Sequence, residues 1–247
     1  MSRKRSVIVS YGKPMDIKST HNEVKQKVFD LSFSSWEEYT NLLEPIHVSW
    51  LRQAKKQKGS AVIDYLSKSD LNQHKLLAST LIFTKKIKKI VKKEQNVGIL
   101  LPSSAACVIT NMSTLMAGKT IVNINYTTAL EAVEKSLVSA EVNTIFTSRK
   151  FIDKLEKRGI KVENIFNSRK VIFLENLGKE ITSKQKALSF LKAKFLPTFL
   201  LKAWYFKNVT LDTPAAILFS SGSEGTPKGV MLSHKNIVAN SKQISDV

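Results

Sequence analysis

The ten residues from Ser220 to Gly229 constrain this 247-residue chain more than any other stretch. They contain four hydroxyl side chains, three glycines and one lysine, and no bulky side chain covers the backbone. An apolar run, 215–219, precedes them and is typical of a buried strand. Glycines let backbone N–H groups approach an anion closely, while hydroxyls and a lysine add donors and a full charge. The stretch therefore predicts a loop that leaves the end of a strand and binds phosphate.

The spacing of this loop differs from two common nucleotide-binding motifs. A P-loop has the pattern G-x-x-x-x-G-K-[ST]. Gly222 and Lys228 keep its separation, but Pro227 and Gly229 stand in place of its second glycine and its hydroxyl residue. No G-x-G-x-x-G fingerprint is present either. The apolar residues 230–232 predict a second short strand, followed by a helix that Ser233 caps. The expected order is strand, loop, strand, helix.

Residues 220–234, S-S-G-S-E-G-T-P-K-G-V-M-L-S-H, resemble the phosphate loop of the adenylate-forming (AMP-binding) acyl synthetases. The form with Glu224 is most similar to the synthetase half of bifunctional enzymes that join 2-acylglycerophosphoethanolamine acyltransferase to acyl-[acyl-carrier-protein] synthetase. The resemblance implies that the loop surrounds the β- and γ-phosphates of ATP. The residues it assigns to phosphate binding are Ser220, Ser221, Gly222, Ser223, Glu224, Gly225, Thr226, Lys228 and Gly229. Because the Glu224 carboxylate would repel phosphate, we expect it to accept a hydrogen bond from a loop N–H group.

The resemblance also implies a reaction and its partners. A fatty acid would be activated by ATP with Mg²⁺ as an acyl-adenylate, and a phosphopantetheine thiol of acyl carrier protein or CoA would then take the acyl group. In the family, the groups that hold adenine, Mg²⁺ and the fatty acid, and the catalytic lysine, all follow this loop. The resemblance therefore implies no complete catalytic set and no Mg²⁺ ligand in this chain, and we expect an internal fragment of a ligase of fatty acid and phospholipid metabolism. Two alternatives stay open: an inactive remnant or split-enzyme subunit, and a basic membrane-surface binding module.

Residues 1–52 resemble, less closely, the tail of a glycerolipid acyltransferase domain, in the stretches V-I-V-S-Y-G-K-P-M and V-F-D-L-S. Such acyltransferases use a His and an Asp separated by four residues, with the His as general base. None of the four histidines here has an Asp five positions on, so this chemistry is not assigned to the chain. Residues 6–11 predict a strand. The polar residues 53–60 predict a boundary, after which 53–247 would form the first part of the AMP-binding domain.

Apolar runs and helical patterns alternate along the middle of the chain. Strands are predicted at 97–102, 120–124, 143–146 and 170–174, and helices at 71–93, 105–116, from 125, and at 150–155. This alternation predicts an α/β fold with an incomplete, doubly wound parallel sheet and helices on both faces. The segments V-G-I-L-L-P, M-A-G-K-T-I-V-N-I-N-Y-T and T-I-F-T-S-R also resemble the N-terminal subdomain of adenylate-forming enzymes.

The formal net charge of +19 comes from 33 lysines and only six arginines against 20 acidic residues. No arginine-rich or nucleic-acid-binding module accompanies it, so we predict no nucleic-acid partner. The charge suits a solvated surface, or one that faces anionic lipid or an acidic carrier protein. One cysteine, no signal peptide and no apolar run of 18 residues predict a cytoplasmic protein, with the inner face of the membrane as the alternative. The apolar and basic stretch 187–206 predicts helix around Pro197, either packed on the core or at a membrane interface.

Overall fold

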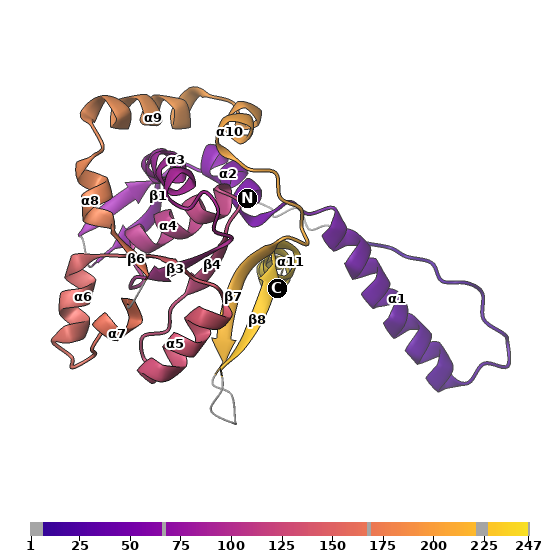
Figure 1. The fold of residues 1–247 in the computed structure, drawn as a ribbon. Helices are drawn as coiled ribbons and strands as arrows, with labels where there is room; N and C mark the ends of the chain where they lie inside the picture. The colour runs from indigo at the N-terminus through magenta and orange to yellow at the C-terminus, as the bar shows by residue number, and fades with distance from the viewer. Residues whose placement is uncertain (1–6, 66–67, 167–168, 221–226, 247) are drawn as a thin grey trace.

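The computed structural model describes residues 7–65, 68–166, 169–220 and 227–246. Across these residues, six strands form the central sheet, in the order β6-β5-β3-β4-β7-β8 (Figure 1). Their bounds are β3 (Asn96–Leu100), β4 (Thr120–Asn123), β5 (Thr144–Thr147), β6 (Lys170–Phe173), β7 (Pro214–Ser220) and β8 (Lys228–Ser233). All neighbouring strands are parallel except β8, which is antiparallel to β7. The predicted doubly wound parallel sheet is therefore confirmed, with an antiparallel hairpin at one edge.

Helices cover both faces of this sheet (Figure 1). One face carries α5 (Leu130–Ser139), α6 (Arg149–Glu156) and the short α7 (Glu163–Phe166). The other face carries α2 (Ile46–Lys56), α3 (Gln73–Ile90), α4 (Ala105–Met116) and α8 (Leu174–Lys179). The helix predicted at 105–116 is α4 with the same bounds.

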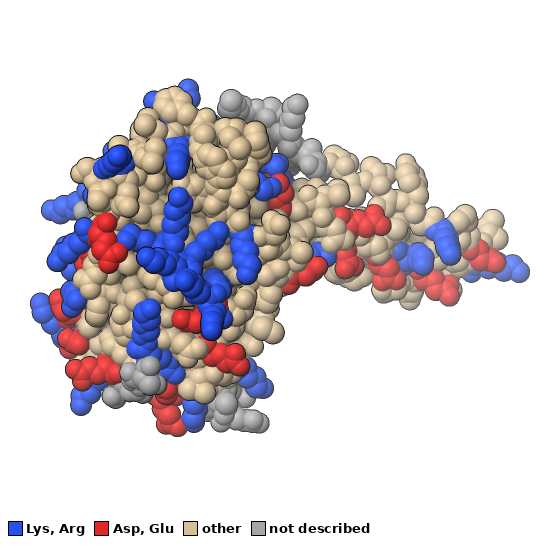
Figure 2. Space-filling model, turned by 45° about the horizontal axis from the view of Figure 1, so that its top comes forward, with Lys and Arg blue, Asp and Glu red and all other residues tan. Residues whose placement is uncertain are grey.

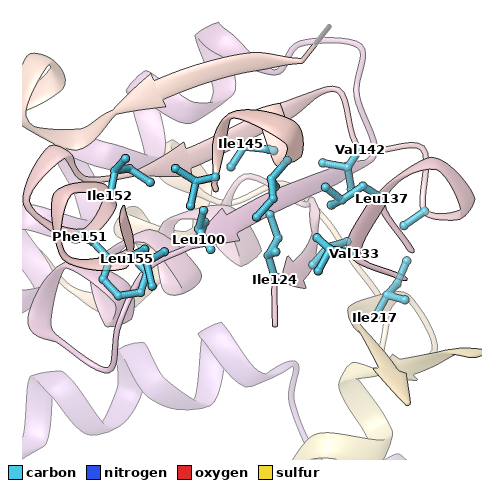
Figure 3. Close-up of a cluster of buried hydrophobic side chains, with 14 residues drawn as sticks. Leu100, Ile124, Val133, Leu137, Val142, Ile145, Phe151, Ile152, Leu155 and Ile217 are labelled. Carbon is cyan, nitrogen blue, oxygen red and sulfur yellow. The ribbon is translucent and has the colours of Figure 1, made fainter. Parts of the chain in front are cut away.

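Along each strand, buried side chains alternate between the two faces of the sheet, because neighbouring side chains of a strand point to opposite faces. Leu100 of β3 and Ile145 of β5 pack toward α5 and α6, where Val133, Leu137 and Leu155 meet them (Figure 3). Their neighbours in sequence, such as Ile99 and Phe146, pack on the opposite face. Gly98 lies in the middle of β3, and a Cβ atom there would lie 2.9 Å from Val142 Cγ1. The sheet is thus buried on both faces, as its continuous apolar runs indicate.

The structure adds a hairpin that the sequence did not predict, formed by β1 (Ser60–Asp64) and β2 (Ser69–Asn72). The Asp64 carboxylate accepts a hydrogen bond of 3.0 Å from the backbone N–H of Ala105, the first residue of α4. A carboxylate is favourable there because the first N–H groups of a helix have no partner within the helix. This buried polar contact therefore helps to dock the hairpin on the sheet domain.

Residues 7–20 and α1 (His21–Asn41) project from the body as an arm (Figure 1). The predicted strand at 6–11 is wrong in its described part, since residues 7–11 form no strand. None of the strands in the described residues pairs with residues 7–11, and Val7 and Val9 are 83% and 66% exposed. The expected boundary between residues 52 and 53 falls within α2, whose Leu51 and Ala54 are buried in the body. The assignment of residues 1–52 to an acyltransferase tail stays a prediction.

The helix expected from residue 125 begins later, at Leu130. The Asn125 side-chain oxygen accepts hydrogen bonds from the Thr127 backbone N–H at 3.1 Å and from the Thr127 hydroxyl at 2.7 Å. Asparagine side chains compete with helix formation in this way, by bonding the backbone two residues on. The turn 125–129 consequently separates β4 from α5 and opens space at the end of β4.

Candidate functional site

The two described ends of the predicted phosphate loop are the last residue of β7, Ser220, and the first of β8, Lys228. Ser220 pairs with Lys228 and Phe219 pairs with Gly229 in the antiparallel register. The Ser220 hydroxyl lies 3.5 Å from the Lys228 carbonyl oxygen. The structure thus brings Ser220, Lys228 and Gly229 together at one end of the hairpin. The other residues assigned to the loop lie outside the described residues: Ser221, Gly222, Ser223, Glu224, Gly225 and Thr226.

A cavity of about 780 Å³ lies beside the base of this loop. It is lined by the ends of β4 and β7, the turn that follows β4, one face of α5, and Pro227. Its floor is apolar, from Val122, Val133, Leu137 and Phe219, and its polar lining residues are Asn123, Asn125, Thr128, Ser136 and Ser220. The carboxyl ends of parallel strands are where ligands bind in open α/β sheets. A cavity of this size, apolar with a few polar groups, is typical of a small-molecule site.

Several of the polar groups at the cavity are already engaged within the chain. The Thr128 hydroxyl donates to the Asn125 carbonyl at 2.9 Å, and the Ser136 hydroxyl donates to the Ala132 carbonyl at 2.7 Å. These contacts orient the side chains and leave the hydroxyl oxygens able to accept. None of these positions was predicted from the sequence, since they lie about 90 residues before the loop and form no motif with it.

Gly229 has a packing role beside its place in the loop. A Cβ atom there would lie 2.9 Å from Cε1 of Phe219, whose ring lines the cavity. Glycine therefore lets the Phe219 ring lie against the opposite strand. Lys228 is exposed, and its backbone lies one residue from this contact.

A buried pair of histidines anchors the helix that follows the hairpin. His234 is the first residue of α11 (His234–Asp246), and its Nδ1 accepts a hydrogen bond of 3.4 Å from the Ile46 backbone N–H. Its ring meets the ring of His47 edge to face, with 5.1 Å between centroids. Burial lowers the pKa of His234 to about 4 and, with the charge of His234, the pKa of His47 to about 3. Both rings are therefore neutral near pH 7.

The start of α11 agrees with the sequence. The Asn236 backbone N–H donates to the Ser233 hydroxyl at 3.2 Å, so Ser233 caps the helix as predicted. The histidine pair was missed, because His47 and His234 lie far apart in the sequence and no spacing links them.

The described part of the chain contains neither a group of metal ligands nor a helix that could span a membrane. There, no three His, Cys, Asp or Glu side chains come together in a way that could hold a metal ion. Of the helices in the same residues, none has both the length and the apolar content needed to cross a membrane.

Comparisons with known proteins agree with the predicted family and fold. The model of the AMP-binding enzyme family matches residues 52–247. The long-chain-fatty-acid–CoA ligase of Bacillus subtilis is 28% identical over 170 residues, which cover 62% of this chain and 30% of that protein. The medium-chain-fatty-acid–[acyl-carrier-protein] ligase JamA of Moorena producens is 34% identical over 73 residues, or 30% of this chain and 12% of that protein.

A solved structure shows the same fold. The N-terminal subdomain of Klebsiella oxytoca NpsA, in complex with 3-hydroxybenzoyl-AMSN, superposes with a TM-score of 0.57 at 17% identity, covering 81% of this chain and 44% of that one. The likeness confirms the expected N-terminal subdomain fold of adenylate-forming enzymes. The chain spans less than a third of the length of the first curated relatives it matches. Since the family model covers most of the sequence, the chain belongs to the AMP-binding enzyme family.

Proposed function

We propose that this chain is part of an ATP-dependent fatty acyl ligase, in which the β7–β8 loop holds the β- and γ-phosphates of ATP. The observation that carries the proposal is the place of the loop. Its described ends, Ser220 and Lys228, pair at the end of the β7–β8 hairpin, and Ser220 and Pro227 line a cavity of about 780 Å³ at the carboxyl ends of β4 and β7. Membership of the AMP-binding family supports the same function.

The loop would have two tasks in this reaction. A carboxylate oxygen of the fatty acid bonds to the α-phosphorus of ATP, the bond from that phosphorus to the bridging oxygen breaks, and pyrophosphate leaves with the electron pair. The Lys228 ammonium and the hydroxyls of the loop then neutralise negative charge that grows on the leaving phosphates. They also hold the phosphates in line for attack. Neither task requires a covalent bond to the protein.

Mg²⁺ accompanies ATP in this family and would add positive charge at the same phosphates. The contribution of this chain at those phosphates would come from the Lys228 ammonium and the loop hydroxyls. In the second step, the acyl group passes to a phosphopantetheine thiol. Relatives that are named as a CoA ligase and an acyl-carrier-protein ligase support both acceptors equally.

Two other functions share part of this support. A split-enzyme subunit or an inactive remnant would carry the same loop and the same cavity, and would need a second polypeptide for activity. A basic membrane-surface module is favoured by a different part of the molecule, the outer helices described below.

The experiment that tests the ligase proposal is ATP–pyrophosphate exchange dependent on a fatty acid. The chain alone is compared with a completed domain, in which residue 247 is continued by the part of the Bacillus subtilis ligase that follows the matched segment. We expect exchange from the completed domain and none from the chain alone. A folded completed domain without exchange would contradict the ligase proposal and favour the inactive remnant.

A second measurement keeps the test valid if the completed domain does not fold. Tripolyphosphate is added to the chain itself, and the backbone amide signal of Gly229 is followed by NMR. We expect a shift that Lys228→Ala weakens and that Lys235→Ala, a change of another lysine seven residues on, leaves unchanged. If both variants behave like the original chain, the loop does not bind phosphate through Lys228.

A further inference from the structure

The outermost layer of the molecule is formed by α9 (Ser183–Phe195) and α10 (Thr198–Tyr205), which lie over α3 (Figure 1). The side chains that α9 and α10 bury are Ser189, Ala193, Leu201 and Tyr205. Ala193, Leu201 and Tyr205 pack in one cluster with Leu77 and Leu81 of α3 and Leu51 of α2, and Phe190 and Leu196 lie partly buried against it. The inner faces of α9 and α10 therefore attach to the body through large side chains as well as small ones.

Five other large apolar side chains of these helices are exposed. Leu188, Leu191 and Phe195 are 50%, 51% and 68% exposed, and Phe199 and Trp204 on α10 are 68% and 55% exposed. On α9 the three residues are spaced by three and four positions, so they form one line along the helix. We call these five side chains the apolar ridge. The helices predicted at 187–206 thus pack on the core through their inner faces, and contact of their outer faces with a membrane stays a prediction.

Lysines surround the apolar ridge. A groove of about 310 Å³ runs between α3 and α9, and Leu188 of the ridge forms part of its wall. Its cationic lining residues are Lys85, Lys86, Lys89 and Lys192. Figure 2 shows Lys and Arg side chains gathered in the middle of the face that carries these helices. The sequences of α3, α9 and α10 contain ten lysines and no acidic residue.

Few of these charges are neutralised within the molecule. Lys86 pairs with Glu180 at 2.5 Å, while Lys85, Lys89 and Lys192 form no ion pair with a described residue. Two of them lie against aromatic rings: the Lys85 Nζ atom is 5.0 Å from the Tyr205 ring centre, and the Lys192 Nζ atom is 5.6 Å from that of Trp204. The surface therefore presents a positive groove directly beside exposed apolar side chains.

We propose that α9 and α10 form an interfacial binding surface for an anionic phospholipid bilayer. The apolar ridge would enter the boundary between headgroups and acyl chains, and the lysine groove would lie at the level of the lipid phosphates. Helices that bind in this way carry large apolar side chains on one face and lysines on the polar face. Anionic lipids attract such lysines, and an aromatic side chain such as Trp204 is favoured at the headgroup level.

An acidic protein would also attract the lysines, but the ridge favours a bilayer. Five large apolar side chains stand at least half exposed on the outermost helices, and a carrier protein that binds by charge alone would leave them in water. Vesicle binding itself does not depend on the ligase reaction. Only its consequence, that a ligase on this surface would meet fatty acids at the membrane, rests on the proposed function.

The test measures sedimentation of the chain with vesicles of phosphatidylglycerol and phosphatidylcholine, and with vesicles of phosphatidylcholine alone, without ATP or fatty acid. We expect binding to the anionic vesicles only. The ridge variant, Leu191→Ser with Phe195→Ser and Phe199→Ser, keeps the charge. The groove variant, Lys85→Gln with Lys89→Gln and Lys192→Gln, keeps the ridge. Each variant is expected to lower affinity by at least about tenfold. The groove variant loses three lysines that anionic lipids attract, and the ridge variant loses apolar side chains that the bilayer would bury.

A matched control removes the same charge from the opposite face of the sheet: Lys150→Gln, Lys154→Gln and Lys157→Gln, in and next to α6. These lysines are exposed, and this variant should stay within about twofold of the original chain. If the control loses as much affinity as the groove variant, the binding is due to net charge and the proposal is wrong. Full binding by the ridge variant, or binding of an acidic carrier protein with none to anionic vesicles, would equally overturn it.

A spectroscopic readout covers the case in which a triple variant fails to fold. Anionic vesicles should shift the tryptophan emission of the original chain to shorter wavelength, because Trp204 leaves water. Trp204→Phe should remove most of that shift, although Trp36 and Trp50 remain. A shift that persists unchanged in Trp204→Phe would place the membrane contact elsewhere.

Discussion

The buried His47–His234 pair predicts that folding stability falls when the pH is lowered below about 6.5. The ordinary pKa of histidine is 6.5, and burial lowers it to about 3 for His47 and about 4 for His234. Between these values the unfolded chain binds protons that the folded chain does not. Stability is therefore complete above pH 6.5 and is lost as the pH falls toward the folded pKa values.

The magnitude follows from the size of the shifts. Each group that is protonated only in the unfolded chain costs about 1.4 kcal/mol per pH unit below 6.5. Going from pH 7.5 to pH 5.5 should therefore lower the free energy of unfolding by about 2.7 kcal/mol for the pair. That is a large part of a typical stability of about 5 to 15 kcal/mol. This pH range also lies above the ordinary carboxylate pKa values, so few acidic groups contribute.

The assay is urea unfolding followed by circular dichroism at pH 7.5, 6.5 and 5.5. The informative variant is His47→Leu, because the buried Nδ1 atom of His47 has no hydrogen-bond partner and little is lost with it at pH 7.5. This variant should lose about half as much stability as the original chain at pH 5.5. His21→Gln, on the exposed start of α1, is the control and should keep the full loss. If the original chain loses less than about 1 kcal/mol, or His47→Leu loses as much as the original chain, the reasoning is refuted.

Three further predictions concern the sheet domain and its activity. Gly98→Ala should destabilise the fold by about 1 to 3 kcal/mol through overpacking, since its Cβ atom would lie 2.9 Å from Val142 Cγ1; an unchanged urea midpoint would contradict this. Arg169→Ala should lower the free energy of unfolding by about 2 to 3 kcal/mol in the same assay. The buried Arg169 guanidinium donates to both Glu134 carboxylate oxygens, at 2.7 and 2.9 Å, and to the Val142 carbonyl. Arg169→Lys should recover only part of this stability. The chain alone should release no pyrophosphate from ATP in the presence of a fatty acid, and release that rises with the amount of purified chain would show that the catalytic set is complete here.

The sheet could be predicted because its signals are local. The buried run at 97–102 and the helical pattern at 105–116 each specify their own element, and β3 and α4 lie within a few residues of the expected bounds. The start of α5 could not be placed, since it depends on one hydrogen-bonded turn at Asn125. The composition of 187–206 predicted helix but not what each face of α9 meets. That depends on how α9 lies on α3, which is a property of the folded chain.

Of the candidate site, the sequence predicted the loop but not the cavity beside it. The composition of residues 220–229 predicts a phosphate loop, which stays a prediction, and of its described residues Ser220 and Pro227 line a cavity. The cavity itself is formed largely by β4 and α5, whose polar residues Asn123 and Ser136 carry no signal of their own. They come near the loop only because β4 and β7 are neighbours in the sheet.

The central claim is that Lys228 acts on the phosphates of ATP, and its most direct test is the rate of fatty acid-dependent ATP–pyrophosphate exchange by the completed domain with Lys228→Ala. Because the ammonium acts mainly as charge develops on the leaving pyrophosphate, kcat should fall more than the KM for ATP rises. The expected loss is about a hundredfold in kcat, or about 3 kcal/mol. Lys228→Arg should recover only part, since a planar guanidinium does not replace a compact charge, and Lys235→Ala should have no effect. A completed domain with Lys228→Ala that keeps its full kcat would contradict the assignment of Lys228 to the phosphates.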